Sequence, residues 1–365
     1  MPEQKATPRV FFEAWRGRYA DNPRAIFEHL LNDESDSWTF QWATTPGAAR
    51  PTGLDPRART IPRNRAAYFN ALMSASHLVT NDMMPRMPPR IKPLEYVQTW
   101  HGTPLKRIGF ETESKAVSKR YLQRLERDVR RWSYLLSPGP EITLVLRRAF
   151  GYEGDVIESG YPRNDVLLSA TADLTRQRVR DSLNIGESTR VVLYAPTWRD
   201  NRVGPDGRPA WVPQFDLSTV GRQLDDTVIL QRLHPVVQAG APPSSGPIID
   251  VSGWPDIADL YLAADVLVTD YSSAMFDFAV TDRPIVLYPF DLGSYERDCR
   301  QTYWPLQEIA PGPLVTTAAD LSEVLSDAGL SRLPSSTSYR VFRERFLPND
   351  DGRASERVIR TVFHV

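Results

Sequence analysis

Residues 265–292 read DVLVTDYSSAMFDFAVTDRPIVLYPFDL, and this stretch contains a strand, a helix and a second strand in succession. The apolar run at 266–268 stops at polar residues, which predicts a short buried strand of a parallel sheet. Ser272 or Ser273 can act as the N-cap of the helix that follows, and a second apolar run at 284–288 predicts the next strand. This order predicts a right-handed βαβ unit and therefore an α/β fold.

The polar residues between the first strand and the helix lie where such sheets bind ligands, at the carboxyl ends of the strands. Residues 270–273 bring two serine hydroxyls and the free N–H groups of the first helical turn to this position. The helix dipole adds a partial positive charge. These features favour a phosphate group as the ligand. The alternative is that TDYSS only caps a helix.

The length and composition are typical of a globular protein with two domains. The chain has 365 residues, more than a single core normally supports, and its hydrophobic and charged fractions of 41% and 24% are ordinary. The formal net charge of −1 provides no global attraction for a polyanion, so we expect no nucleic-acid partner. Binding to a polyanion or a membrane would then depend on a local patch of charge.

Three sequence features favour a cytoplasmic location. The single cysteine, Cys299, excludes an internal disulfide framework and a multi-cysteine metal site. The charged amino-terminal residues 1–19 lack the apolar core of a signal peptide. No stretch approaches about 20 uninterrupted apolar residues, the length that a transmembrane helix needs.

Two more predicted strands end in side chains that can bind phosphate. The strand predicted from the run RVVLY leads into Thr197 and Arg199, and a guanidinium can hold phosphate through two parallel hydrogen bonds. The strand predicted at 227–230 leads into Arg232 and His234. Together with the serine pair, these groups converge on one edge of one parallel sheet. A diphosphate is the simplest ligand that uses all of them.

His101 follows a fourth predicted strand, at 96–100, and the chain turns immediately after it at Gly102 and Pro104. A histidine at a strand's carboxyl end can point into a ligand site. Its usual pKa near ~6.5 suits a general base that activates a hydroxyl at neutral pH. The alternative is a histidine that only packs or caps.

Residues 115–132 predict a helix with a strongly basic face. Such a face can lie on an anionic membrane surface, where each cation contributes up to ~1 kcal/mol. It can equally meet a polyanionic acceptor or simply be solvated. The cations of the segment from Lys115 to Arg131 are Lys115, Lys119, Arg120, Arg124, Arg127, Arg130 and Arg131.

Other elements complete the predicted organisation. Asn22 is predicted to cap a helix with Pro23 in its first turn, and the Pro/Gly/Arg-rich residues 45–65 are predicted to form a loop. Residues 338–346 and 354–363 are predicted to form terminal helices that cross back to the first domain.

Five motifs in order resemble the CDP-glycerol glycerophosphotransferase family, whose members build teichoic acid and related polymers. The likeness extends from about Phe12 to about Thr316. The motifs are WHGTPLK at 100–106, GYPRND at 160–165, APTWR at 195–199, LHP at 233–235 and TDYSSAMFDF at 269–278.

The resemblance implies a GT-B fold, in which two Rossmann-like domains face each other across a cleft. We expect an acceptor-side domain at 1–165 and a nucleotide-binding domain at 166–335. The C-terminal helices at 336–365 are expected to pack back on the first domain.

The resemblance also implies the reaction and its residues. We expect transfer of glycerol phosphate or ribitol phosphate from CDP-glycerol or CDP-ribitol to a terminal hydroxyl of a polymer or lipid-linked acceptor, with release of CMP. No Asp-x-Asp pair is present, so we expect no metal and no cofactor. His101 and His234 are the implied catalytic residues. The implied substrate-binding residues are Gly102, Thr103, Arg163, Pro196, Thr197, Arg199, Arg232, Ser272, Ser273 and Asp277.

Two other functions remain open at this point. One is a GT-B glycosyltransferase that uses a nucleotide sugar. The other is a non-catalytic module that binds an anionic polymer, or the inner face of the cell membrane, through its basic helix.

Overall fold

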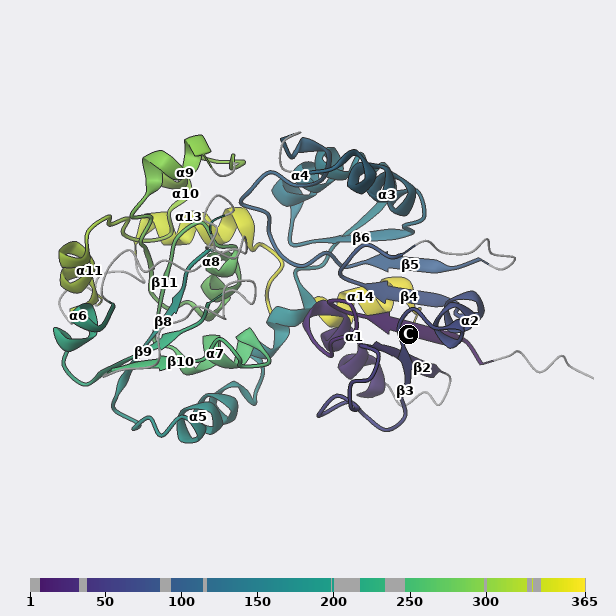
Figure 1. Ribbon diagram of the computed structural model, residues 1–365, viewed down its shortest axis with the longest axis horizontal. Coiled ribbons are helices and arrows are strands. Elements are labelled where there is room, and N and C mark those ends of the chain that lie inside the picture. Colours follow the sequence, from purple (N-terminus) through teal and green to yellow (C-terminus); the bar gives the residue numbers. More distant parts are fainter. Residues whose placement is uncertain are drawn as a thin grey trace, which may run out of the picture. The chain divides into compact units, whose positions relative to one another are not determined.

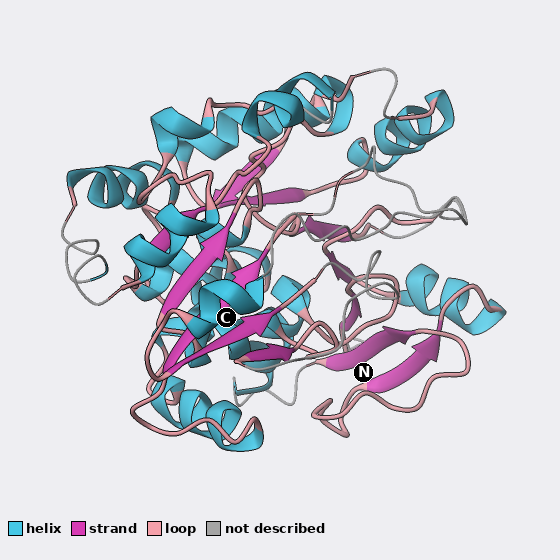
Figure 2. Cartoon of the chain, turned by 60° about the vertical axis from the view of Figure 1, so that its left-hand side comes forward, coloured by secondary structure: helices cyan, strands magenta, loops and turns pink. Residues whose placement is uncertain are grey.

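The structure of the chain is a computed structural model, and it describes residues 7–32, 38–85, 93–113, 117–197, 199, 217–233, 247–298, 301–326, 330 and 336–364. The chain divides into two units, and each has its own parallel sheet with flanking helices (Figures 1 and 2). The first unit comprises Met1–Gly102, Ile108–Asp165 and Pro348–Val365. The second comprises Thr103–Arg107 and Val166–Leu347.

The sheet of the first unit has the strand order β3-β2-β1-β4-β5-β6-β7, and all of its pairs are parallel. The order reverses between β1 and β4, which makes their carboxyl ends a switch point where such sheets bind ligands. The strands are β1 (Arg9–Glu13), β2 (Thr39–Thr44), β3 (Arg59–Pro62), β4 (His77–Thr80), β5 (Glu95–Gln98), β6 (Tyr134–Ser137) and β7 (Asp155–Glu158).

Alternation along β1 explains how helices cover both faces of this sheet. Phe12 belongs to a core formed with α1 (Asp21–Asn32) and α14 (Ala354–Val362), whereas Phe11 contacts Tyr68 of α2 (Ala66–Ser74). The remaining helices of the unit are α3 (Lys119–Val129), α4 (Pro140–Phe150) and the 3-10 turn η1 (Gly109–Glu111), and η2 (Pro162–Leu168) leads into the second unit.

The sheet of the second unit is also parallel, with the order β10-β9-β8-β11-β12. Its switch point lies between β8 and β11. Strand β11, which lies between β8 and β12, is fully buried, as its continuous apolar run predicts. The strands are β8 (Arg190–Ala195), β9 (Thr227–Gln231), β10 (Ile248–Asp250), β11 (Val266–Thr269) and β12 (Ile285–Leu287).

Helices α6 (Leu217–Arg222) and α11 (Ala318–Leu325) form a core with one face of the second sheet. Helices α5 (Ala172–Ser182) and α7 (Ile257–Ala263) pack against each other. The other elements are α8 (Ala274–Phe278), η4 (Ala279–Thr281), α9 (Leu292–Asp298), α10 (Leu306–Ile309) and α13 (Thr337–Phe346).

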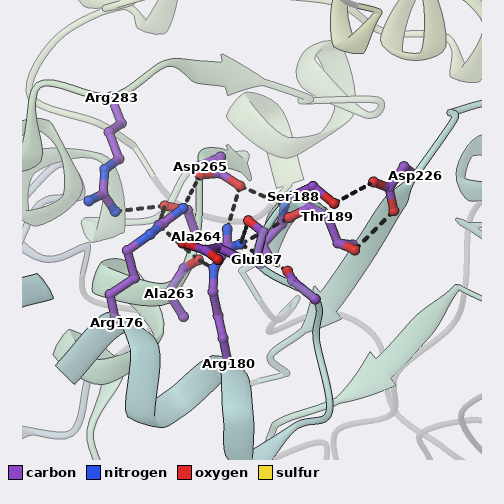
Figure 3. A network of polar contacts seen from close by, with 12 residues as sticks. Arg176, Arg180, Glu187, Ser188, Thr189, Asp226, Ala263, Ala264, Asp265 and Arg283 are labelled. Atoms are coloured by element: carbon purple, nitrogen blue, oxygen red, sulfur yellow. Dashed lines mark hydrogen bonds and ion pairs between the residues drawn. The ribbon is translucent and has the colours of Figure 1, made fainter. Parts of the chain in front are cut away.

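Three arginines gather at the amino end of β11 (Figure 3). Arg176 and Arg180 of α5 both donate to the carboxylate of Asp265, which directly precedes the strand. These two and Arg283 also donate to carbonyl groups at the carboxyl end of α7, where cations stabilise a helix. This network stabilises the fold at the end of the sheet opposite the switch point.

The structure confirms the predicted βαβ unit but shortens its helix. Strands β11 and β12 pair in parallel, as predicted. Helix α8 covers only five residues, and the chain then tightens into the 3-10 turn η4 before Asp282, whose φ is +58°. The partial charge of so short a helix is smaller than we expected.

Two predictions about the first unit are wrong. Asn22 does not cap α1, because the helix begins one residue earlier, at Asp21, whose carboxylate accepts from the Asn22 N–H group at 2.7 Å. Residues 45–65 are not all loop, because they include β3. Strand β3 lies at the sheet edge, where Pro62 removes no ladder hydrogen bond that the sheet needs.

The expected C-terminal segment at 336–365 is divided between the units. Helix α14 packs on the first unit, but α13 packs on the second, where Phe342 stacks on Phe276 at 5.1 Å. The aromatic residues of α13 therefore keep it on the second unit. Among the described helices, none is long and apolar enough to cross a bilayer.

Candidate functional site

The carboxyl edge of the first sheet holds His101 in a ring of side chains from four loops. His101 follows β5, Asn81 follows β4, Trp15 follows β1, and Arg163 belongs to η2. Strands β1, β4 and β5 are neighbours in the sheet, so parallel topology brings the first three of these segments together.

The imidazole of His101 is held in one tautomer. Its Nδ1 lies 2.8 Å from the carbonyl oxygen of Asn81, and a carbonyl can only accept, so Nδ1 carries the proton. The other nitrogen, Nε2, then has a free lone pair. The ring also stacks on Trp100 at 3.9 Å and contacts Trp15 at 4.7 Å. This arrangement suits a general base that acts through Nε2.

The surroundings of His101 favour its neutral form. Burial lowers the pKa of His101 below its usual value of 6.5, against the opposing effects of the Asn81 carbonyl and the carboxylates of Asp21 and Asp82. The positive charge of Arg163 lowers it further. The imidazole is therefore unprotonated at neutral pH, as a base must be.

Arg163 fastens the His101 loop to helix α1. Its Nη1 donates to the His101 carbonyl at 2.8 Å and to Asp21 at 3.2 Å, and its backbone N–H donates to Asn22. The Asn22 amide in turn donates to the carbonyl of Trp100 at 3.2 Å. Arg163, one of the predicted substrate-binding residues, thus lies beside His101 in the first unit.

Glycine at position 102 is favoured by its backbone conformation beside Arg163. Its φ is +125°, and a Cβ built on it would lie 2.5 Å from Arg163 Nη2. Trp100 also has a left-handed backbone, with φ of +52°. Such strain in a bulky residue costs about 1–3 kcal/mol and tends to cluster at functional sites.

In the second unit, Arg199 joins the loops that follow three strands. Its Nη1 donates to Asp270 after β11 at 2.9 Å and to the carbonyl of Thr197 after β8 at 2.6 Å. Its Nε and Nη2 donate to the two carboxylate oxygens of Asp291 after β12, both at 2.8 Å. The guanidinium also lies over the ring of Tyr271 at 5.1 Å.

This geometry corrects our expectation for Arg199. Burial by itself would lower its pKa, but the hydrogen bonds to Asp291 and the charge of Asp270 outweigh that effect and raise it. All three guanidinium nitrogens donate to protein acceptors, and the side chain is 6% exposed. Arg199 therefore connects the loops. Its pair of parallel hydrogen bonds goes to the carboxylate of Asp291.

Two other predicted residues lie at a strand end of the second unit. Pro196 and Thr197 follow β8, and the Thr197 N–H group donates to Asp270 at 2.8 Å. Among the described residues, the buried hydroxyl of Thr197 has no hydrogen-bond partner, and the same is true of Thr103. The predicted phosphate-binding hydroxyl of Thr197 is thus at the switch point.

The motif that contains Thr103 is shared between the units. His101 and Gly102 belong to the first unit, whereas Thr103–Arg107 belongs to the second. The Leu105 carbonyl accepts from Tyr303, and the Arg107 N–H group donates to Gln301. The chain after His101 is therefore anchored to the second unit.

The remaining predicted residues have different surroundings. Ser273 is the N-cap residue of α8 but makes no side-chain cap, whereas Ser272 Oγ accepts from the Ala274 N–H group. Asp277 is buried in α8. Arg232 donates to the carbonyls of Val251 and Trp254. His234 lies outside the described residues.

The family model for CDP-glycerol:poly(glycerophosphate) glycerophosphotransferases matches residues 2–364 of the chain. The chain belongs to this family. The sequence resemblance on which we based our expectation is therefore confirmed over nearly the whole chain.

Two glycerophosphotransferase relatives differ in how much of their length this chain covers. It is 33% identical to the teichoic acid poly(glycerol phosphate) polymerase of Bacillus subtilis over its entire length, but it spans only 49% of that protein. It is also 33% identical to the teichoic acid glycerol-phosphate transferase of Staphylococcus aureus, of which it spans 92%.

A solved structure supports the fold of this family member. The wall teichoic acid polymerase TagF matches with a TM-score of 0.88 and 31% identity, over 98% of this chain and 89% of that one. The predicted GT-B class, with two Rossmann-like domains, is confirmed by this match.

Sequence reasoning missed the residues that support His101 and Arg199. Asn81 and Asp291 each follow a strand, and the strand-end rule that selected His101 would have selected them too. Asp270 was placed at a strand end, but its pairing with Arg199 was not predicted. Asp21 and Asn22 carried no such signal, because their sequence pattern only indicates a helix start.

Proposed function

We propose that this chain transfers glycerol phosphate, or ribitol phosphate, from a CDP-alcohol to a terminal hydroxyl of a growing teichoic-acid-like or capsular polymer, and releases CMP. The family supports the donor and the polymer acceptor. The observation that carries the proposal is the Nδ1 contact of His101 with the Asn81 carbonyl, because it leaves Nε2 as a base.

In the proposed mechanism, His101 Nε2 takes the proton of the acceptor hydroxyl. The hydroxyl oxygen then attacks the phosphorus that bears the glycerol. A new P–O bond forms to the acceptor as the bond to the CMP phosphate breaks in line, and CMP leaves with the electron pair. The protonated imidazole afterwards releases its proton to solvent.

The cationic and hydroxyl groups of the second unit are proposed to stabilise the negative charge on the diphosphate. Thr197, Arg232, His234, Ser272 and Ser273 are the candidates, and Asp277 is the candidate acceptor for hydroxyl groups of the donor. Arg199 contributes by holding the loops that carry Thr197 and the serine pair, as its contacts with Asp270 and the Thr197 carbonyl indicate.

The test is a mass-spectrometric transfer assay with CDP-glycerol, CDP-ribitol, and UDP- and CMP-sugars, each offered with a lipid or oligosaccharide primer. We expect extension of the primer and CMP release with a CDP-alcohol alone. His101→Asn should reduce kcat by about 10²- to 10⁴-fold, the usual contribution of a general base. Transfer of a sugar would instead identify a glycosyltransferase, and a silent wild type would favour a binding module.

We also propose that no metal ion is needed, because the positive groups of the second unit can carry the charge. Loss of activity with EDTA that magnesium restores would contradict this.

We further propose that α3 attaches the protein to the inner face of the membrane. Its exposed residues include Lys119, Arg120, Arg124 and Arg127, and the nearby Phe110 is 40% exposed. Each cation near an anionic surface contributes about 1 kcal/mol. In a vesicle flotation assay, replacing Arg120, Arg124 and Arg127 with Gln should release the protein.

The matched control changes Arg178, Arg222 and Arg340 to Gln, which removes the same charge from the second unit. That variant should float with anionic vesicles like the wild type. Equal loss in both variants, or equal flotation with neutral vesicles, would contradict attachment through α3.

A further inference from the structure

The turn that follows β1 is strained over three consecutive residues. Trp15, Arg16 and Gly17 have φ values of +44°, +59° and +108°. Left-handed conformations are normally adopted by single residues, and a bulky residue such as Trp avoids them. Strained backbone of this kind persists only where the surroundings enforce it, and it concentrates at ligand sites.

The surroundings of the turn enforce this conformation at several points. A Cβ on Gly17 would lie 2.5 Å from the backbone nitrogen of Thr45, so only glycine fits beside β2. The Trp15 N–H group donates to the Asn81 side chain at 3.0 Å. The Trp15 indole N–H donates to Asp21 at 2.8 Å, which sets the plane of the ring.

The result is an exposed aromatic ring fixed beside the proposed base. Trp15 is 38% exposed, and its ring lies 4.7 Å from the ring of His101. The next side chain, Arg16, is 78% exposed and makes one long contact of 3.4 Å with Asp82. An exposed tryptophan alone would need no explanation, but this one is held in place by strained backbone.

We propose that the Trp15–Arg16 turn binds the acceptor end of the polymer, and this inference rests on the proposed function. The acceptor hydroxyl must come within about 3 Å of His101 Nε2, so the terminal polyol unit has to lie near the indole. The indole face covers the C–H groups of that unit at little entropic cost. Arg16 exchanges its weak contact with Asp82 for the next phosphate of the polymer.

The Trp15–Arg16 turn then contacts the acceptor and does not contact the donor. The base acts on the acceptor hydroxyl, whereas the groups proposed to hold the donor diphosphate follow strands of the second unit. Variants of the turn should therefore change the KM for the acceptor and leave the KM for the CDP-alcohol within about twofold.

The test measures both KM values with a short synthetic poly(glycerol phosphate) acceptor. Trp15→Ala should raise the acceptor KM at least tenfold, and Arg16→Gln should raise it severalfold with a weaker dependence on salt. Arg57→Gln is the control, because Arg57 is 60% exposed and pairs with Asp55 elsewhere in the same unit. It should leave both KM values unchanged.

A second measurement does not depend on turnover. In protein labelled with 5-fluorotryptophan, the Trp15 signal is assigned with Trp15→Phe, and it should shift when the acceptor is added without donor. An unchanged acceptor KM in Trp15→Ala, a rise in the donor KM instead, or an unmoved Trp15 signal would overturn the inference while the proposed function stands. A wild type that transfers to no acceptor would refute the proposed function itself.

Discussion

At the scale of single residues, the contact between His101 and the Asn81 carbonyl decides how the imidazole can act. The carbonyl fixes the proton on Nδ1, and burial lowers the pKa of His101 below 6.5. Since a base works only when neutral, the lowered pKa extends the pH range of activity to more acidic values. With an ordinary exposed histidine as the base, the enzyme would lose activity at a higher pH.

We therefore predict that the acid limb of kcat/KM for the wild type has its midpoint below pH 6.5. The acid limb of a pH–rate profile reports the pKa of the base in the free enzyme. The limb should be absent from the residual activity of His101→Asn. His29→Gln, at an exposed position of α1, should leave the profile unchanged. A midpoint at or above 6.5 would contradict the assignment.

Asp128 of α3 is a buried carboxylate that the proposed mechanism does not use. It accepts hydrogen bonds from Tyr96 and Trp132, and it is 3% exposed. Burial raises its pKa to about 6, against these hydrogen bonds. A carboxyl whose pKa is raised on folding stabilises the protein below its unfolded value near 4, and this stability is lost as the pH rises through 6.

We predict that Asp128→Asn removes this pH dependence. Between pH 4 and pH 7.5, the stability of the variant relative to the wild type should increase by about 2–3 kcal/mol, since one pKa unit corresponds to ~1.4 kcal/mol. Urea denaturation at both pH values measures it. Glu126→Gln, on the exposed side of the same helix, is the control and should show little change. A constant difference between Asp128→Asn and the wild type would refute the raised pKa.

At the scale of elements, Arg199 connects the segments that follow β8, β11 and β12. The buried carboxylate of Asp270 and the partly buried carboxylate of Asp291 converge on its guanidinium. If the arginine is removed, both carboxylates lose the positive charge that they share. Removing one partner of a buried ion pair normally costs 3–5 kcal/mol.

We predict that Arg199→Met lowers the free energy of unfolding by about 3–5 kcal/mol. Arg178→Met is the matched control, because Arg178 is 63% exposed in its pair with Asp259 and such pairs contribute about 0–1 kcal/mol. Chemical denaturation of both variants measures the difference. If both variants lose a similarly small free energy of unfolding, Arg199 is instead available to bind a ligand directly.

At the scale of the whole molecule, the chain contributes Thr103–Arg107 to the second unit, enters it again at Val166 and returns to the first unit at Pro348. The last helix, α14, then completes the core of the first unit. Ile359 and Val362 pack with residues of β1 and α1, and Phe363 stacks on His77 at 4.9 Å. The stability of the first unit thus depends on residues at the far end of the sequence.

We predict that Ile359→Ala destabilises the first unit by about 2–5 kcal/mol. Hydrogen exchange should show lower protection in β1 and β4 and unchanged protection in β8 and β11. Val341→Ala, at a position of α13 that is 49% exposed, should change neither unit. Equal loss of protection in both sheets would show that the units unfold together.

The sequence was sufficient to predict most of the strands and helices and the place of His101. Continuous apolar runs identified the buried strands, and the residue after a strand's carboxyl end is a ligand position in any parallel sheet. Strand β3 was not predicted, because an edge strand can form without a long apolar run and can contain proline. Helix α13 was misassigned because its pattern shows that it is amphipathic but not which core it faces.

The sequence by itself determined the α/β class, the family and the residue types that the reaction needs, because these depend on local periodicity and on motifs. Only the tertiary structure decided which partner each polar side chain takes. Arg199 is the clearest case, since a guanidinium binds a carboxylate and a phosphate with the same geometry. Asp270 and Asp291 contact Arg199 only because β8, β11 and β12 are neighbours in the sheet. No local sequence pattern shows which strands are neighbours.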